Sequence, residues 1–243
     1  MKQNYKDYTK EDQEVWNLLF KRQRENLSDK ASKVYLDCLD KMAPCLNNKS
    51  IPDFKKINSF FAIHTEWEIH VVPGLIPVDE FFELLSRKKF CSSTWLRNME
   101  QIDYLEEPDM FHDIFGHIPL LLDPIFSKFA QAFGKLGLQF SGNEQIQLQL
   151  QRIYWFTIEF GLMRENGELK IYGAGIASSY GESKHIFDEE VQTMPYNIKE
   201  VIETDFDTDH IQNQYFIIDS FEELFLSLEI FRSQIALQLA KAS

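Results

Sequence analysis

The chain has 243 residues, of which 44% are hydrophobic and 14% aromatic, enough apolar side chains for one substantial core. Its formal net charge of -13 and its pI near 4.9 argue against a surface that binds nucleic acid or an anionic membrane, because no basic stripe is available to displace counterions from phosphate. The first residues contain no apolar export signal and no stretch of about 18 apolar residues occurs, so we expect a cytoplasmic protein without a membrane span.

The first third of the chain has mainly helical spacing. Residues 9–47 carry apolar side chains at helical intervals, and Thr9 can cap their start. Pro52 begins another short helical segment. Residues 67–72 have the pattern of a strand, and residues 78–88 that of a helix.

The rest of the chain is again mainly helical. Residues 107–116 are predicted to form a helix that ends at Gly116. Further elements are expected as helices over 124–136, 143–163 and 219–239 and as a short strand over 168–172. Because no internal repeat, low-complexity tract or linker is present, the sequence predicts a single, mainly α domain over residues 1–243.

The three cysteines are Cys38, Cys45 and Cys91. Their number is odd and their spacing lacks a CxxC pair, which argues against a disulfide framework and against a zinc site built from thiolates. We expect reduced residues that serve packing.

Two histidines and one acid form the main candidate for a chemical site. Glu159 lies inside the apolar run IYWFTIEFGLM, downstream of His112 and His117 in FHDIFGH. If that run is helical, Glu159 occupies the centre of an apolar face, where an ionised carboxylate costs several kcal/mol unless a cation meets it. Two imidazoles and one carboxylate, with other coordination positions open, are the facial set of non-haem Fe(II) sites that activate O2.

The spacing of the histidine pair requires a change in backbone geometry. Residues five apart on an ideal helix are rotated by roughly 140° and do not share a face. Gly116 can adopt the left-handed conformation at a helix end, so we predict that it turns His117 back toward the metal that His112 reaches from the last turn.

A second set of potential ligands alternates along His64, Glu66, Glu68 and His70. On a strand these four side chains would share one face, which is a possible metal site. Strict alternation with apolar residues is also what a half-exposed strand produces, and we favour that interpretation.

Three stretches of this sequence, EPDMFHDIFGH, IYWFTIEFGL and IYGAGIASSYGE, closely resemble the signatures of the pterin-dependent aromatic amino acid hydroxylases. VVPGLIP and Arg97, which follows Phe81 by sixteen residues, fall in register with the same family. The resemblance covers roughly residues 8–230. It implies a mainly α catalytic domain with a few short strands, whose helices surround a mononuclear iron cleft with His112, His117 and Glu159 as ligands.

For the pterin, the resemblance implies that Phe81 stacks on the ring and that the backbone beside it lines the same site. Asp113 matches a position associated with water contacts to the pterin, and Tyr154 matches a tyrosine near the iron. The implied cofactor-binding residues are Gly74, Leu75, Ile76, Val78, Phe81, Asp113 and Tyr154.

For the substrate, the resemblance implies that Arg97 grips the carboxylate of an amino acid, where a planar fork can make two charge-assisted bonds. Asp109 and Glu182 would support the site without performing chemistry. The implied substrate-binding residues are Arg97, Tyr104, Leu105, Pro108, Trp155, Phe160, Gly175 and Ser178.

The implied activity is that of a monooxygenase that uses Fe(II), a tetrahydropterin and O2 to convert phenylalanine into tyrosine. Two alternatives stay open: the same chemistry on tryptophan, on tyrosine or at another ring position, and a metal-binding protein without activity. Leu105 and Val78 depart from the threonine and serine of animal members, so we expect the contacts at these positions to differ. The regulatory and tetramerisation segments of animal members have no counterpart, so we expect a monomer without allosteric activation by substrate.

Overall fold

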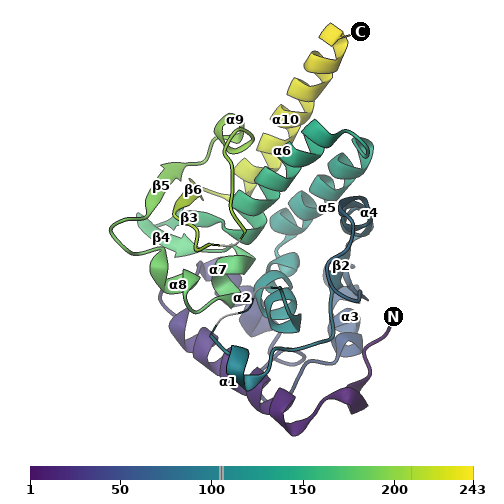
Figure 1. Ribbon diagram of the computed structural model, residues 1–243, viewed down its shortest axis with the longest axis vertical. Helices are drawn as coiled ribbons and strands as arrows, with labels where there is room; N and C mark the ends of the chain where they lie inside the picture. Colours follow the sequence, from purple (N-terminus) through teal and green to yellow (C-terminus); the bar gives the residue numbers. More distant parts are fainter. Residues whose placement is uncertain (104, 106, 209, 243) are drawn as a thin grey trace.

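The computed structural model describes residues 1–103, 105, 107–208 and 210–242, which fold into a mainly α domain, as expected (Figure 1). The α-helices are α1 (Lys10–Asn26), α2 (Lys33–Lys41), α3 (Phe54–Ala62), α4 (Val78–Ser86), α5 (Pro124–Gln139), α6 (Glu144–Tyr154), α7 (Ala174–Ser178), α8 (Glu182–His185), α9 (Ile198–Val201) and α10 (Phe221–Ala242). Shorter helical turns are the 3-10 helices η1 (Tyr5–Asp7), η2 (Met99–Gln101) and η4 (Pro119–Leu122) and the π-helices η3 (His112–His117) and η5 (Trp155–Glu159).

The strands form two small sheets. Strands β1 (Glu68–Val71) and β2 (Lys89–Ser92) pair in parallel. The second sheet has the order β4-β3-β6-β5 and contains β3 (Leu162–Glu165), β4 (Glu168–Ile171), β5 (Gln192–Pro195) and β6 (Gln214–Ile218). In it, β3 and β4 are antiparallel, and β6 is parallel to both β3 and β5. Figure 1 shows this sheet on one side of the molecule and the packed pair α4 and α5 on the other.

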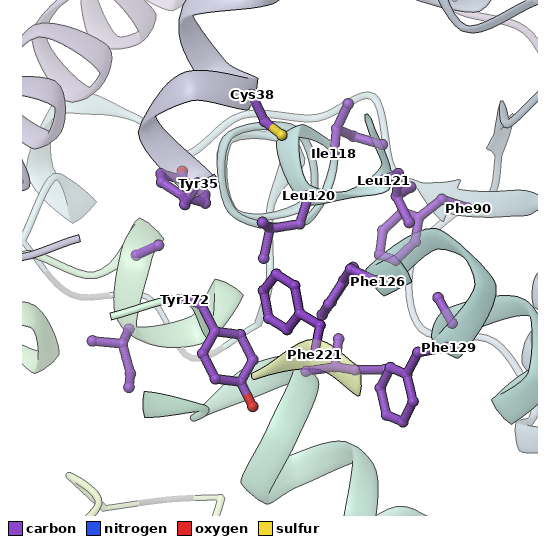
Figure 2. Packing of buried hydrophobic residues seen from close by; sticks show 14 of the residues in the cluster. Tyr35, Cys38, Phe90, Ile118, Leu120, Leu121, Phe126, Phe129, Tyr172 and Phe221 are labelled. Carbon is purple, nitrogen blue, oxygen red and sulfur yellow. The ribbon is translucent and has the colours of Figure 1, made fainter. Parts of the chain in front are cut away.

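One continuous apolar core joins the helices to the sheet. In its centre Phe126 of α5 packs between Leu120 of η4 and Phe221 of α10 (Figure 2), with ring centroids of Phe126 and Phe221 5.1 Å apart. Tyr172 meets Phe221 edge to face at 5.2 Å. The core therefore anchors the start of α5 and of α10 against the strand that precedes α7.

The periodic helices agree with the sequence. α4, α5 and α10 begin at or within two residues of the predicted starts, and the predicted helical region 9–47 contains α1 and α2. Thr9 caps α1 through a reciprocal pair of hydrogen bonds with Asp12. The cysteines are free, as predicted, but Cys91 faces a cavity instead of serving packing alone.

Two predicted helices are wrong in their form, and both carry the candidate ligands. The segment predicted as a helix ending at Gly116 continues as a π-helix through His117. The helix predicted over 143–163 is α-helical only to Tyr154, becomes a π-helix to Glu159, and is followed by β3. Within the described ranges, no helix is long and apolar enough to cross a membrane.

Candidate active site

The two histidines meet because the backbone between them is π-helical. A π-helix closes its hydrogen bonds over five residues, so each turn holds more residues than an α-helical turn and residues five apart approach each other. The Nε2 atoms of His112 and His117 lie 3.1 Å apart. The predicted left-handed turn at Gly116 is wrong, since the positive-φ glycines of the described chain are Gly142 and Gly167.

Gly116 is required for a different reason. A Cβ atom at this position would lie 2.7 Å from the carbonyl oxygen of Ala174, closer than real Cβ contacts allow. Helix α7 packs directly against η3 here. The glycine therefore permits the close approach of α7, which brings Ser178 to the histidine pair.

Glu159 closes the site from the end of the second π-helix. Its Oε1 lies 3.1 Å from Nε2 of His117, and its Oε2 lies 3.6 Å from Nε2 of His112. The side chain is 13% exposed, so the expectation of a largely buried carboxylate agrees with the structure. Arg152, two turns earlier, does not meet it, because Arg152 pairs with Asp205 and with the carbonyl of Ile202.

The donor set fits a metal ion. Three ligand atoms on one face of an octahedron, each about 2.1 Å from the ion, lie about 3.0 Å from one another. The separations among His112, His117 and Glu159 are 3.1, 3.1 and 3.6 Å, so small movements would complete the geometry. The alternating residues from His64 to His70 form no comparable group in the described part of the chain.

One other described group, His185, Asp188 and Glu190, has ligand atoms at similar separations. Both acids are exposed, and the two ring nitrogens of His185 are already bonded to Asp188 and Asn213. The histidine would have to lose one of these bonds to bind a metal, so the first group is the better site.

At neutral pH, the surroundings of His112 and Glu159 favour the protonation states that bind a metal. Burial lowers the pKa of His112 to about 4, which keeps its imidazole neutral. Burial alone would raise the pKa of Glu159, but the nearby His117 and His112, with hydrogen bonds from His117 and Tyr154, lower it to about 2. Neutral imidazole and ionised carboxylate are the forms that bind a metal.

Ser178 fixes which nitrogen of His112 is available. Its hydroxyl donates to the carbonyl of Ala174 at 2.8 Å and lies 2.9 Å from Nδ1 of His112. Since the hydroxyl proton is used, Nδ1 must carry the proton and donate it, which leaves Nε2 free as a ligand. Gly175 lies against Glu159: a Cβ there would meet Oε2 at 3.1 Å.

A cavity of about 300 Å³ opens beside the three ligands. All seven residues expected to bind a pterin line it: Gly74, Leu75, Ile76, Val78, Phe81, Asp113 and Tyr154. The rings of Phe81 and Tyr154 meet edge to face with centroids 5.2 Å apart. Asp113 accepts a hydrogen bond from the backbone of Ser93, and burial, only partly offset by that bond, raises its pKa to about 7.

The residues expected to bind substrate are divided between the cavity and its supports. Pro108 and Trp155 line the cavity. Phe160 packs against Trp155 with tilted rings whose centroids are 4.5 Å apart, and it does not line the cavity. Leu105 also lies outside the lining, and Tyr104 lies outside the described residues.

Arg97 is buried and not a solvated surface residue. Its Nε and Nη2 donate to the two carboxylate oxygens of Asp109 at 2.8 and 3.0 Å. Asp109 has no exposed surface and also accepts from the backbone nitrogens of Arg97 and His112. The pair therefore connects the segment of Arg97 to the start of η3.

The sequence alone did not indicate that Phe206 and Gln212 reach the site. Phe206 stacks on Trp155 with centroids 4.8 Å apart and lines the cavity. Gln212 accepts a hydrogen bond from the indole of Trp155, and its backbone nitrogen donates to Glu182. Glu182 also accepts from the hydroxyl of Tyr215 at 3.0 Å. No local pattern in the sequence marks Phe206 or Gln212 as site residues, because their contacts with Trp155 join residues far apart in the chain.

Comparisons with known proteins agree with this site. The family described as "Biopterin-dependent aromatic amino acid hydroxylase" matches residues 2–240. A phenylalanine-4-hydroxylase of Ralstonia nicotianae is 40% identical over 226 residues, which cover 93% of this chain and 71% of that protein.

Two solved structures of Chromobacterium violaceum phenylalanine hydroxylase are similar over the whole chain. The structure with iron(III) and 7,8-dihydrobiopterin has a TM-score of 0.91 at 38% identity, covering 100% of this chain and 87% of that one. The structure with iron and phenylalanine has a TM-score of 0.90 at 36% identity, covering 100% and 88%. On the family match and these similarities, this chain belongs to the biopterin-dependent aromatic amino acid hydroxylases.

Proposed function

We propose that this protein is an iron- and tetrahydropterin-dependent monooxygenase that hydroxylates L-phenylalanine to L-tyrosine with O2. The observation that carries the proposal is the facial arrangement of His112, His117 and Glu159 at the wall of a cavity lined by every residue expected to bind a pterin. Relatives named phenylalanine-4-hydroxylase, and the similar structures with dihydrobiopterin or phenylalanine bound, support this choice of cofactor and substrate.

In this proposal His112, His117 and Glu159 hold Fe(II) through Nε2, Nε2 and the carboxylate. Bound there, Fe(II) would activate O2 and the tetrahydropterin would supply two electrons, so that one oxygen atom would go to the substrate ring and the other to the pterin. The protein orients the ligands: Ser178 fixes His112 through Nδ1, and Tyr154 contributes a hydrogen bond to Glu159.

The cavity offers both an apolar surface and polar groups to a pterin. Phe81 presents a ring for stacking, and Gly74, Leu75, Ile76 and Val78 line the same cavity. Ser93 also lines the cavity, and its buried hydroxyl has no partner in the described part of the chain, while its backbone nitrogen donates to Asp113. A heterocycle with several donors and acceptors suits this combination.

The substrate ring would lie against Trp155 and Pro108, beside Phe206, which also lines the cavity. We assign the carboxylate of the substrate to Arg97, whose Nε and Nη2 are held by Asp109 and whose Nη1 has no hydrogen-bond partner among the described residues. We also propose a single catalytic domain over residues 1–243, which the one continuous core supports. We propose that the protein is a monomer, and sedimentation at several protein concentrations tests this oligomeric state.

Product analysis tests the function. The protein is loaded with Fe(II) without oxygen, then mixed with O2, a tetrahydropterin and phenylalanine, tyrosine or tryptophan in separate reactions. Tyrosine formed from phenylalanine, dependent on both iron and pterin and absent in Glu159→Ala, is expected. Pterin oxidation without a hydroxylated amino acid would reject the substrate, and faster product from tryptophan would favour the alternative reaction.

A further inference from the structure

Gln151 is a polar residue of the cavity that the sequence motifs do not explain. It lies on α6, three residues before Tyr154, and its side chain lines the cavity. Among the described residues, none forms a hydrogen bond with its side-chain amide. A side-chain amide carries two donors and an acceptor with two lone pairs, so this group has its full capacity available to a ligand.

Two contacts locate Gln151 relative to the ring of Phe81. On α6, Gln147, Gln151 and Tyr154 follow the spacing i, i+4 and i+7, which places them on one face of the helix. Gln147 donates to Asp79 at 2.7 Å, and Tyr154 meets Phe81 edge to face. Gln151, between them, therefore faces the start of α4 where Phe81 presents its ring.

Helix α6 runs toward the iron ligands. The helix continues through Tyr154 into η5, which ends at Glu159. Gln151 consequently lies on the side of Tyr154 away from the metal-binding group. A pterin that stacks on Phe81 with one edge toward Glu159 can therefore place a substituent of its ring near Gln151.

We infer that Gln151 binds the hydroxyl groups of the side chain at C6 of the tetrahydropterin and so selects the cofactor. The inference rests on the proposed function and assigns a ligand group to a residue outside the family signatures. The neighbouring lining residues Leu75, Val78 and Phe81 are apolar, so they cannot recognise hydroxyl groups through their side chains. A few convergent polar groups in an apolar cavity are what confer ligand specificity.

Binding titrations test the inference without turnover. Iron-loaded protein, kept anaerobic, is titrated calorimetrically with 7,8-dihydrobiopterin, which has a dihydroxypropyl side chain, and with 6-methyl-7,8-dihydropterin, which has none. In Gln151→Leu we expect a threefold to tenfold weaker binding of dihydrobiopterin, about the effect of one neutral hydrogen bond, and unchanged binding of the methyl compound. The matched control is Gln147→Leu, one turn away and outside the cavity, which should leave the ratio of the two dissociation constants unchanged.

Each other outcome is decisive. Equal weakening of both ligands in Gln151→Leu, or binding of both as in the wild type, would overturn the role of Gln151 while the proposed function stands. A wild-type protein that binds neither pterin would overturn the proposed function as well. Gln151→Glu, which keeps an acceptor at the same position, should retain part of the preference for dihydrobiopterin.

Discussion

Replacing Arg97 with alanine should destabilise the iron-free protein strongly. Asp109 has no exposed surface, and Arg97 is the one described residue that forms an ion pair with it. The substitution deletes two charge-assisted hydrogen bonds but leaves the two that Asp109 accepts from backbone nitrogens. Removing one partner of a buried pair costs about 3–5 kcal/mol, and the remaining bonds place our expectation near 3 kcal/mol. For a protein of this size that is a fall in Tm of about 6–12 °C.

Urea unfolding followed by circular dichroism measures the change in the free energy of unfolding. Thermal unfolding followed in the same way measures the change in Tm. The control is Arg87→Ala, which removes an exposed pair with Glu83 and should cost less than about 1 kcal/mol. Adding Asp109→Asn to Arg97→Ala should restore part of the loss, because the uncompensated charge is removed. A Tm of Arg97→Ala within about 2 °C of the wild type would refute the reasoning.

In turnover assays the same variant should chiefly raise the KM for phenylalanine, and an unchanged KM would remove Arg97 from the substrate site.

Three further predictions concern the site and its supports. Glu159→Ala should abolish stoichiometric Fe(II) binding, measured by calorimetry, while the iron-free protein keeps its helical circular dichroism; retained tight binding would exclude Glu159 as a ligand. Gly116→Ala should lower the free energy of unfolding by about 1–3 kcal/mol, because its Cβ would meet the carbonyl of Ala174; a stability equal to the wild type in urea would contradict this. Burial raises the pKa of Glu182 above its ordinary value of 4.5, so its contribution to stability is present below that value and is lost as the pH rises through the folded pKa. Glu182→Gln should therefore gain stability relative to the wild type between pH 4 and pH 7, and a difference that is constant with pH would show that the carboxyl does not titrate in this way.

Part of the site could be predicted because its residues are recognisable from their type and local neighbours. Glu159 is an acid in an apolar run, and such a residue needs a partner wherever the chain folds. The histidines and the turn before α4 belong to contiguous signatures, and the residues expected around a pterin all line one cavity. Helices such as α5 were predictable for the same reason, since an amphipathic pattern repeats within the helix itself.

The tertiary structure decided how these pieces meet. Composition and periodicity determined a mainly α domain, and the signatures determined its family and candidate ligands. The π-helical form of η3 and η5 was not predictable, because it depends on packing such as that of α7 on Gly116, which no local pattern records. Phe206 and Gln212 contact Trp155 from more than 50 residues along the chain. The side chain of Gln151 becomes part of a cavity only when α4 and α6 are assembled. Contacts between distant segments depend on the assembled core, so only the folded chain determines which polar groups remain available to a ligand.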